Sequence, residues 1–158
     1  MLAIIICVGK LKEREYERLC AEYEKRLSRF CRVETASIAE SRLPDNPSDA
    51  QIAAALLREE REMRAAIPKG AYTVALDVAG TKHTSPDFAK RLEIVALTHD
   101  KLAFIVGGSH GLSETVKRDA DLRLSFSDMT FPHHLFRVML LEQLYRAFTI
   151  TAGTPYQK

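Results

Sequence analysis

One stretch near the end of the chain, Phe126 to Tyr145, reads FSDMTFPHHLFRVMLLEQLY and changes character at Pro132. Up to Phe131 it mixes hydroxyl groups, one carboxylate and apolar residues, with neither a helical nor a strand period. Beyond Pro132 it becomes an almost unbroken apolar run with helical spacing. Proline fits the first turn of a helix, because the N–H that it lacks would have no partner there. We therefore expect an exposed loop that leads directly into a buried helix, and such a loop is well placed to hold a ligand.

The helix after this loop is expected over roughly His133 to Ile150, and apolar residues occupy nearly every side of it. A helix that is apolar all round is normally buried all round. On one face of a sheet, however, a helix at the end of a chain would normally expose one side. The sequence therefore predicts that this side packs on a second copy of the chain, which gives a two-fold dimer.

Upstream of this helix, short apolar runs alternate with segments of helical periodicity. Strands are expected at Leu2–Val8, Cys31–Ile38, Ala71–Val78, Leu102–Val106 and Leu122–Phe126. Helices are expected at Lys12–Arg29, from Ser48 to about Ile67, from Ser85 to about Thr98, and at Leu112–Asp119. Ser48 and Gln51 have the spacing of a capping box, and Ser85 stands before a proline suited to the first helical position. This alternation predicts one α/β domain over residues 1–158, with a mainly parallel sheet flanked by helices.

Composition limits the class of protein. The net charge of +2 argues against a polycation that coats nucleic acid, although it leaves room for a local basic surface. Cys7, Cys20 and Cys31 form no CxxC pair, so we interpret them as buried thiols of a reducing compartment. No segment has the length of a membrane span or the pattern of a signal peptide. We therefore expect a cytoplasmic protein with no membrane partner.

In a parallel sheet, ligands bind beyond the carboxyl ends of the strands. Three segments qualify, because each directly follows one of the later strands: Leu76–Gly80, Gly107–Gly111 and Phe126–Phe131. The glycines of the second segment would let its backbone approach a flat ligand, and a tight turn that needs positive φ is the alternative. Their spacing fits neither a dinucleotide-binding GxGxxG turn nor a P-loop. Asp77 could accept hydrogen bonds from a ligand or could cap neighbouring N–H groups.

Ionisable and aromatic side chains near these segments leave several roles open. His133 and His134 lack a carboxylate or cysteine partner at ligand spacing, so no metal site is expected. His110 could titrate near neutral pH or could shape the turn. Arg137, on an otherwise apolar helix, is a candidate for phosphate contact or for a structural salt bridge. Tyr156, near the end of the chain, could stack on a nucleobase or could belong to a frayed terminus.

The three segments, in this order and at this spacing, resemble the RlmH family of ribosomal RNA methyltransferases, within the SPOUT superfamily. The resemblance covers essentially the whole chain, from Val8–Lys10 to Pro155-Tyr156. It includes Leu76–Gly80, is strongest over Ser125–His133 and continues at Glu142–Ala147. It implies an α/β fold with a trefoil knot at its C-terminal end, a homodimer, and S-adenosylmethionine held in the knot. The implied reaction is methyl transfer to N3 of a pseudouridine in large-subunit (23S) ribosomal RNA. Because we see no appended RNA-binding domain, we expect a folded substrate, such as the assembled ribosome.

The same resemblance assigns roles to individual positions. The implied cofactor positions are Leu76, Gly108 and the loop residues Phe126, Ser127, Asp128, Met129, Thr130 and Phe131, with Gly107 as a neighbour. The acceptor N–H must lose its proton, and His133, Asp128 and Tyr156 are the candidate bases. Arg137 is the candidate for contact with the RNA backbone or the floor of the knot. Family members commonly end in Tyr-His, whereas in this chain Gln157 follows Tyr156.

Two alternative functions remain open from the sequence. One is a SPOUT methyltransferase that acts on another RNA nucleoside, such as a tRNA ribose. The other is a non-catalytic, ribosome-associated dimer that binds RNA.

Overall fold

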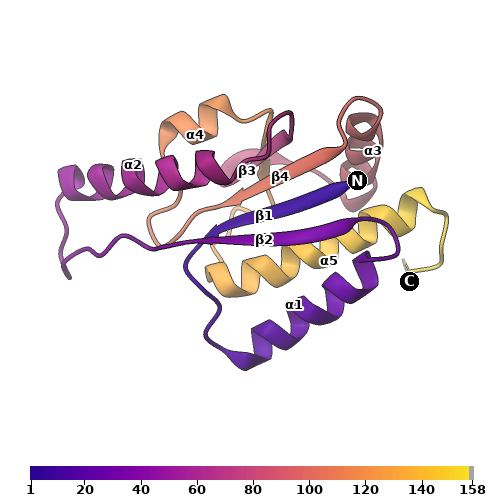
Figure 1. Ribbon diagram of the computed structural model, residues 1–158, viewed down its shortest axis with the longest axis horizontal. Helices are drawn as coiled ribbons and strands as arrows, with labels where there is room; N and C mark the ends of the chain where they lie inside the picture. The colour runs from indigo at the N-terminus through magenta and orange to yellow at the C-terminus, as the bar shows by residue number, and fades with distance from the viewer. Residues whose placement is uncertain (157–158) are drawn as a thin grey trace.

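A computed structural model describes residues 1–156 of the chain, and within them one sheet of five parallel strands has the order β2-β1-β4-β3-β5. The strands are β1 (Leu2–Val8), β2 (Arg32–Ile38), β3 (Tyr72–Lys82), β4 (Lys101–Val106) and β5 (Leu122–Ser125). The helices are α1 (Arg14–Leu27), α2 (Asp49–Ala66), α3 (Ser85–Ala96), α4 (Glu114–Asp119) and α5 (His133–Thr151). Each helix follows a strand (Figure 1), so the predicted parallel α/β sheet flanked by helices is confirmed.

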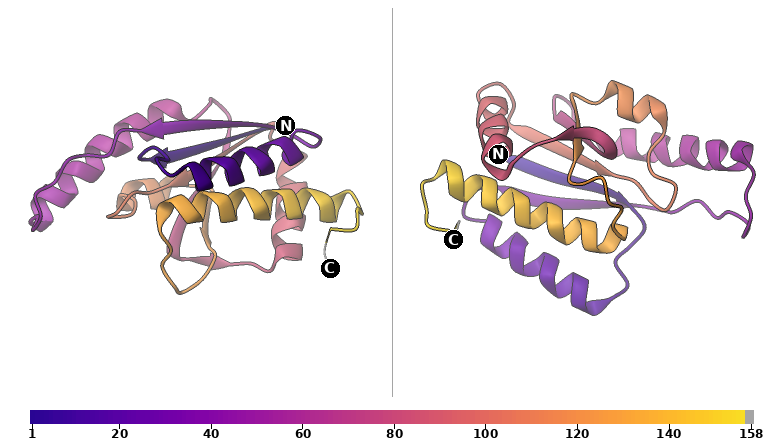
Figure 2. Two further views of the ribbon diagram at one scale, coloured as in Figure 1. Left: turned by 90° about the horizontal axis from the view of Figure 1, so that it is seen from below. Right: turned by 180° about the vertical axis from the view of Figure 1, so that it is seen from behind.

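Helices cover both faces of the sheet, which explains why β1 is apolar at successive positions. Successive side chains of a strand point to opposite faces. Ile5 belongs to the core under α1, α3 and α5, together with Leu144. Ile6 belongs to the core under α2 and α4, together with Met63 and Val116. The two layers are separated by the sheet in Figure 2, where α1 and α5 lie side by side.

The starts of α2 and α3 test the predicted caps. The capping box of α2 is confirmed, because the Ser48 hydroxyl accepts from the Gln51 N–H at 3.3 Å and the Gln51 side chain accepts from the Ser48 N–H at 2.9 Å. The predicted cap of α3 was one residue late. Thr84, not Ser85, is the N-cap, and its hydroxyl accepts from the Asp87 N–H at 3.2 Å. Ser85 is therefore inside the helix, and its hydroxyl remains available for another contact.

The end of β3 also differs from the prediction. The strand does not stop at Val78 but continues to Lys82 alongside β5. Its register against β5 shifts on the way, because Leu76 and Thr81 both pair with Leu124. The residues between these two pairings bulge out of the ladder, at the carboxyl edge of the sheet.

Within a single copy, α5 is already covered on most sides. Pro132 is its N-cap, and the helix lies between α1 and α3. No residue from His133 to Ile150 is fully exposed, but Met139, Glu142 and Gln143 are half-buried on a face that the flanking helices leave partly open. The homodimer that we inferred from this helix stays a prediction, as does the trefoil knot.

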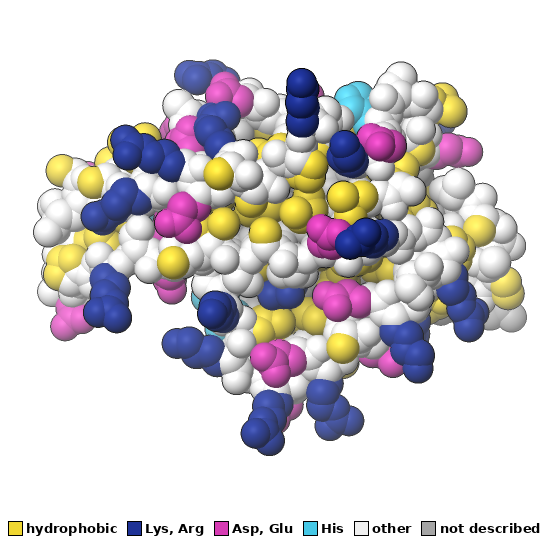
Figure 3. Space-filling view, in the orientation of Figure 1, with side chains coloured by type: hydrophobic (Ala, Val, Ile, Leu, Met, Phe, Trp, Pro, Cys, Tyr) yellow, Lys and Arg dark blue, Asp and Glu magenta, His cyan; other side chains and the backbone are white. Residues whose placement is uncertain are grey.

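The surface seen in Figure 3 carries side chains of both charges, interspersed over most of the visible face. Beneath the surface, Cys7, Cys20 and Cys31 are buried and free, as expected. Burial raises the pKa of Cys20 and of Cys31 to about 11, so both thiols stay protonated at neutral pH. Within residues 1–156, no helix combines the length and apolar character needed to cross a membrane.

Candidate functional site

The three segments expected to bind a ligand lie at the carboxyl ends of β4, β3 and β5, which are neighbours in the sheet. They enclose a cavity of about 350 Å³, which we call the strand-end cavity. Pockets for small molecules range from roughly 300 to 1,000 Å³, so the volume is sufficient for a ligand of modest size. The predicted meeting of the three segments is thus confirmed.

Most of the expected cofactor positions face this cavity. Those that line it are Leu76, Gly107, Gly108, Phe126, Ser127, Met129, Thr130 and Phe131. Asp128 does not line it: its side chain is 81% exposed and forms an ion pair with Lys82. The role of Asp128 as a cofactor position stays a prediction.

The turn after β4 is closed by contacts between backbone atoms. The Gly111 N–H donates to the Gly108 carbonyl at 3.0 Å, and Gly111 has a φ of 75°. A Cβ on Gly107 would lie 2.4 Å from the Gly111 carbonyl oxygen, and a Cβ on Gly108 would lie 2.9 Å from Val8. Positive φ therefore explains only Gly111. The other two glycines are required because the facing backbone and β1 leave no room for a side chain.

An ionic cluster forms a second wall of the strand-end cavity. Asp77 accepts from Arg123 at 2.5 Å and lies 3.9 Å from the Lys117 ammonium. Burial of Asp77 favours its neutral form, but Arg123, Lys117 and the Ala79 backbone outweigh burial and lower the pKa of the carboxyl. Sequence reasoning singled out Asp77 but missed both partners, because each lies about forty residues along the chain with no pattern to connect them.

The third wall is aromatic and is held by a short hydrogen-bonded loop. The rings of Phe126 and Phe136 lie 4.7 Å apart between centroids. The Ser125 hydroxyl donates to the Ser127 carbonyl at 3.1 Å, and the Ser127 hydroxyl accepts from the Met129 N–H at 3.0 Å. The loop thus has a defined shape that presents a flat apolar surface, which suits the face of a heteroaromatic ring.

His133 lines the same cavity at the start of α5. Burial and the neighbouring His134, whose ring lies 3.9 Å away, lower the pKa of His133. Its imidazole is therefore neutral at pH 7 and can accept a proton. His134 instead contacts the Glu13 carboxylate at 3.1 Å. Within residues 1–156, no group of three or more His, Cys, Asp or Glu side chains is arranged to hold a metal ion.

Arg137 lies outside the strand-end cavity. Its guanidinium donates to the Cys7 sulfur at 3.7 Å, and its buried Nε has no hydrogen-bond partner within the described residues. It lines a separate polar cavity of about 300 Å³, together with Lys10, Glu17 and Glu24. The proposed contact of Arg137 with RNA or with the knot floor stays a prediction.

Tyr156 also lies away from the strand-end cavity of its own copy. Its ring packs on Tyr145 with centroids 4.7 Å apart, and its hydroxyl donates to Glu142 at 3.4 Å. Burial and the neighbouring Tyr23 raise the pKa of Tyr156 to about 12. The tail thus packs beside the C-terminal half of α5, while the departure from the family at Gln157 lies outside the described residues.

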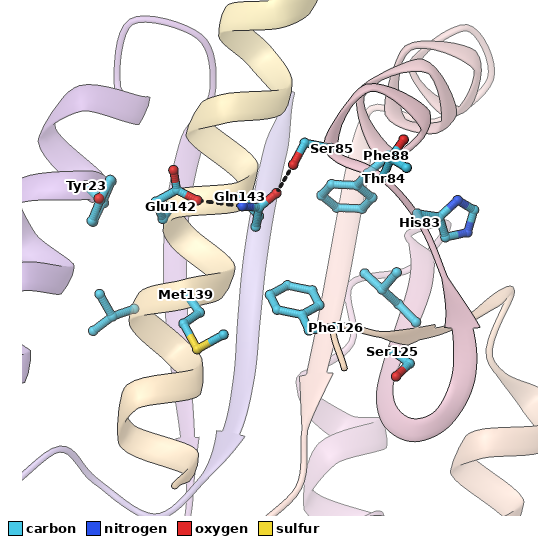
Figure 4. Close-up of a pocket in the computed structure, with 12 residues that line it drawn as sticks. Tyr23, His83, Thr84, Ser85, Phe88, Ser125, Phe126, Met139, Glu142 and Gln143 are labelled. Carbon is cyan, nitrogen blue, oxygen red and sulfur yellow. Dashed lines mark hydrogen bonds between the residues drawn. The ribbon is translucent and has the colours of Figure 1, made fainter. Parts of the chain in front are cut away.

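A second cavity, of about 410 Å³, opens on the face of α5 between α1 and α3, and we call it the α5 cavity (Figure 4). Tyr23 of α1 stands on one side of it, and Ser85 of α3 stands on the other. The Ser85 hydroxyl donates to Gln143 at 2.8 Å, and Gln143 donates to Glu142 at 2.7 Å. Leu124 and Phe126 line both cavities. The sequence does not predict the α5 cavity, because its residues come from elements that are distant in the chain.

Comparison with known proteins places the chain in a family. A family model described as "Predicted SPOUT methyltransferase" matches residues 1–157. Two relatives, from Leuconostoc mesenteroides and Clostridium kluyveri, are both called ribosomal RNA large subunit methyltransferase H. They are 42% and 44% identical over 155 residues, which is 98% of this chain and 98% of each relative.

Solved structures agree on the fold. The structure of a probable methylase family protein from Haemophilus influenzae Rd KW20 matches with a TM-score of 0.58 at 12% identity, over 99% of this chain and 70% of that chain. At this identity the likeness shows the fold alone. The family model and the two relatives show that the chain belongs to the SPOUT methyltransferase family, in the group of ribosomal RNA large subunit methyltransferase H.

Proposed function

We propose that the protein transfers a methyl group from S-adenosylmethionine to N3 of a pseudouridine in large-subunit (23S) ribosomal RNA. We expect it to act in the cytoplasm on the assembled ribosome. The observation that carries the proposal is the strand-end cavity, in a chain 44% identical over nearly its whole length to a ribosomal RNA large subunit methyltransferase H.

The residues of the strand-end cavity fit the chemistry of this cofactor. Leu76 and the ring of Phe126 provide apolar surface for the adenine. The Gly108 backbone, which carries no Cβ of its own and lines the cavity, can approach the ligand closely. Asp77 and Lys117 place opposite charges in the wall, where they suit the polar ribose and the zwitterionic amino-acid end. When bound, the cofactor supplies a methyl group that is already activated for transfer.

The chain must then align the acceptor nitrogen and remove its proton. Alignment of two reactants can lower a barrier by about 7–11 kcal/mol at best. His133 lies in the cavity wall with a lowered pKa, so its neutral imidazole is the best candidate for accepting the N3 proton. The Asp128 carboxylate forms an ion pair with Lys82, and Tyr156, with a pKa of about 12, stays protonated at neutral pH. Both are therefore weaker candidates for the base.

The active form is proposed to be a homodimer that meets across the open face of α5. One end of α5 borders the strand-end cavity at His133, and Tyr156 packs beside its other half. A two-fold axis perpendicular to α5 makes the two copies of this helix antiparallel. The tail of one copy would then approach the strand-end cavity of the other, so that Tyr156 could act across the dimer.

The test of the reaction is transfer of labelled methyl groups to whole ribosomes, free ribosomal RNA and tRNA, followed by mass spectrometry of the nucleosides. The proposal expects methylated pseudouridine from 23S RNA, with whole ribosomes as the best substrate. A methylated nucleoside from tRNA would overturn the proposed reaction and support the alternative, a methyltransferase that acts on tRNA. Binding to RNA without any transfer would instead favour the non-catalytic RNA-binding dimer.

The test of the dimer uses two variants, Gly107→Ala in the strand-end cavity and Tyr156→Ala in the tail, each of which is expected to be inactive alone if the site is shared. If the site is shared, a random mixture contains dimers with one intact site and recovers about a quarter of the wild-type rate. A mixture that recovers nothing would show that cavity and tail act within the same copy.

A further inference from the structure

The solvent side of α1 carries a line of basic side chains. Arg14, Arg18 and Lys25 are spaced by four and seven residues, which places them on one side of a helix of 3.6 residues per turn. Cys20 and Leu27, the residues that α1 buries, lie on the opposite side. All three basic residues are exposed, and Lys and Arg side chains project from the edge of the molecule in Figure 3 where α1 lies. We call Arg14, Arg18 and Lys25 the α1 ridge.

The charges of the α1 ridge are not neutralised inside the molecule. Among residues 1–156, none of the three forms an ion pair. Arg26, on the side of the helix nearer α5, behaves differently. It pairs with Glu22 at 2.9 Å and lies 6.0 Å from the Tyr145 ring centroid. Arg26 therefore contributes to contacts within the fold, whereas Arg14, Arg18 and Lys25 form no ion pair among the described residues.

The position of the ridge relates it to the proposed active site. Glu13, directly before Arg14, contacts His134 at 3.1 Å, and His134 is next to His133 in the wall of the strand-end cavity. The end of α1 that carries Arg14 therefore lies at the same end of the molecule as His133, and the ridge runs away from that end along α1. A strand-like ligand that follows the ridge would reach the cavity at its N-terminal end.

We propose that the α1 ridge binds the phosphate backbone of ribosomal RNA and guides the substrate to the strand-end cavity. The proposal rests on the function proposed above and deepens it. Arg14 and Lys25 are eleven residues apart, about 16 Å along a helix that rises 1.5 Å per residue. Such a length suits a polymer with regularly spaced negative charges better than a single anion.

The neighbours of the ridge favour RNA over a lipid surface. A helix that binds membranes places apolar side chains beside its cations. On α1, Glu15 and Glu22 stand beside the ridge instead.

The experiment compares two triple variants with the same change in net charge. In the ridge variant, Arg14→Gln, Arg18→Gln and Lys25→Gln are combined. In the control, Arg58→Gln, Arg61→Gln and Lys69→Gln remove three exposed cations from α2 and the turn after it, on the other face of the sheet. Affinity for whole ribosomes is measured over a range of salt concentrations, and S-adenosylmethionine binding is measured by calorimetry.

The ridge variant should bind ribosomes at least about tenfold more weakly near 0.1 M salt, and its plot of log affinity against log salt should be flatter by about 2–3. The control should lose less than about threefold, and both variants should bind the cofactor as the wild type does. Equal losses in the two variants, or unchanged binding in the ridge variant, would overturn the proposal.

Two further measurements keep this result separate from the proposed reaction. Arg14→Lys with Arg18→Lys retains the charge and must retain ribosome binding; a loss there would mean that shape, not charge, matters, and would overturn the ridge. If ribosome binding depends on the ridge but no RNA is methylated, the ridge stands and the proposed reaction fails. If the ridge variant methylates ribosomes normally at limiting substrate, the reaction stands and the ridge fails.

Discussion

The strand-end cavity and the α5 cavity share Phe126 as a common wall, yet they are built differently. The first is formed by turns that follow three adjacent strands, and its closest contacts are between backbone atoms, as at Gly107 and Gly111. The second is formed by side chains of separate helices, such as Tyr23 and Gln143. We therefore expect the first cavity to be sensitive to added side-chain atoms and the second to tolerate changes in side-chain size.

The largest effect expected from this comparison is that of Gly107→Ala. The added methyl group would lie 2.4 Å from the Gly111 carbonyl oxygen, so the turn must open. We expect S-adenosylmethionine binding, measured by calorimetry, to fall by at least about a hundredfold, since the cavity wall moves. The control is Gly70→Ala, where φ is 76° but no atom lies within 4 Å of the new methyl group. It should lower stability and leave binding unchanged. Equal losses of binding in Gly107→Ala and Gly70→Ala would show that the clash with Gly111 is not the cause of the loss.

A smaller effect is expected when the common wall is removed. Phe126→Ala should weaken cofactor binding by about tenfold and lower the free energy of unfolding by about 2 kcal/mol, because a half-buried ring that packs on Phe136 is lost. Met139→Ala, which changes only the α5 cavity, should leave cofactor binding unchanged. Calorimetry and chemical unfolding measure the two quantities. A binding loss in Met139→Ala as large as that in Phe126→Ala would mean that the cavities act as one.

The third expected effect, smaller again, is the contribution of His133 to the change of the free energy of unfolding with pH. Its pKa in the folded protein is below the ordinary 6.5, so just below pH 6.5 the unfolded chain binds a proton that the folded chain does not. The free energy of unfolding should therefore rise with pH through this window and level off above it. His133→Gln should remove this part of the rise, measured by chemical unfolding between about pH 5 and 7.5. It should also slow methyl transfer, and an unchanged rate would exclude His133 as the base.

The smallest effect is expected from Asp128→Asn. The carboxylate is 81% exposed and contacts Lys82 rather than the cavity. Exposed ion pairs contribute little to stability, so the free energy of unfolding should change by less than about 1 kcal/mol. Cofactor affinity should change by less than about twofold. The loop around it, unlike its side chain, forms the cavity wall. A larger loss of affinity would restore Asp128 as a cofactor contact and would show that the loop rearranges on binding.

Much of this architecture could be predicted from the sequence because its causes are local. The apolar run of β1, the capping box at Ser48 and Gln51, and the contact of Gly107 with Gly111 each depend on residues close together in the chain. The rule that ligands bind at the carboxyl ends of parallel strands then brought three distant segments together. Neither the strand order nor the side-chain contacts were required for that step.

What the sequence did not reveal depends on contacts between distant residues. The extension of β3 to Lys82 requires β5 as a partner, and no local pattern contains that pairing. Lys117 and Arg123 reach Asp77 only in the folded sheet. The separation of Arg137 and Tyr156 from the strand-end cavity depends on the direction and length of α5. Family resemblance could name Arg137 and Tyr156 but could not say whether they lie beside the strand-end cavity of their own copy.

The bulge in β3 has a consequence for the thermodynamics of ligand binding. Leu124 of β5 pairs with β3 on both sides of it, so the segment that borders the cavity is anchored at each end. A Cβ on Gly80 would come within 2.8 Å of the Arg123 backbone, which shows how tightly the bulge is packed against β5. A wall held in this way has little conformational entropy left to lose when a ligand arrives. The protein should therefore meet its cofactor with this part of the site already ordered, and association should not wait for β3 to fold around it.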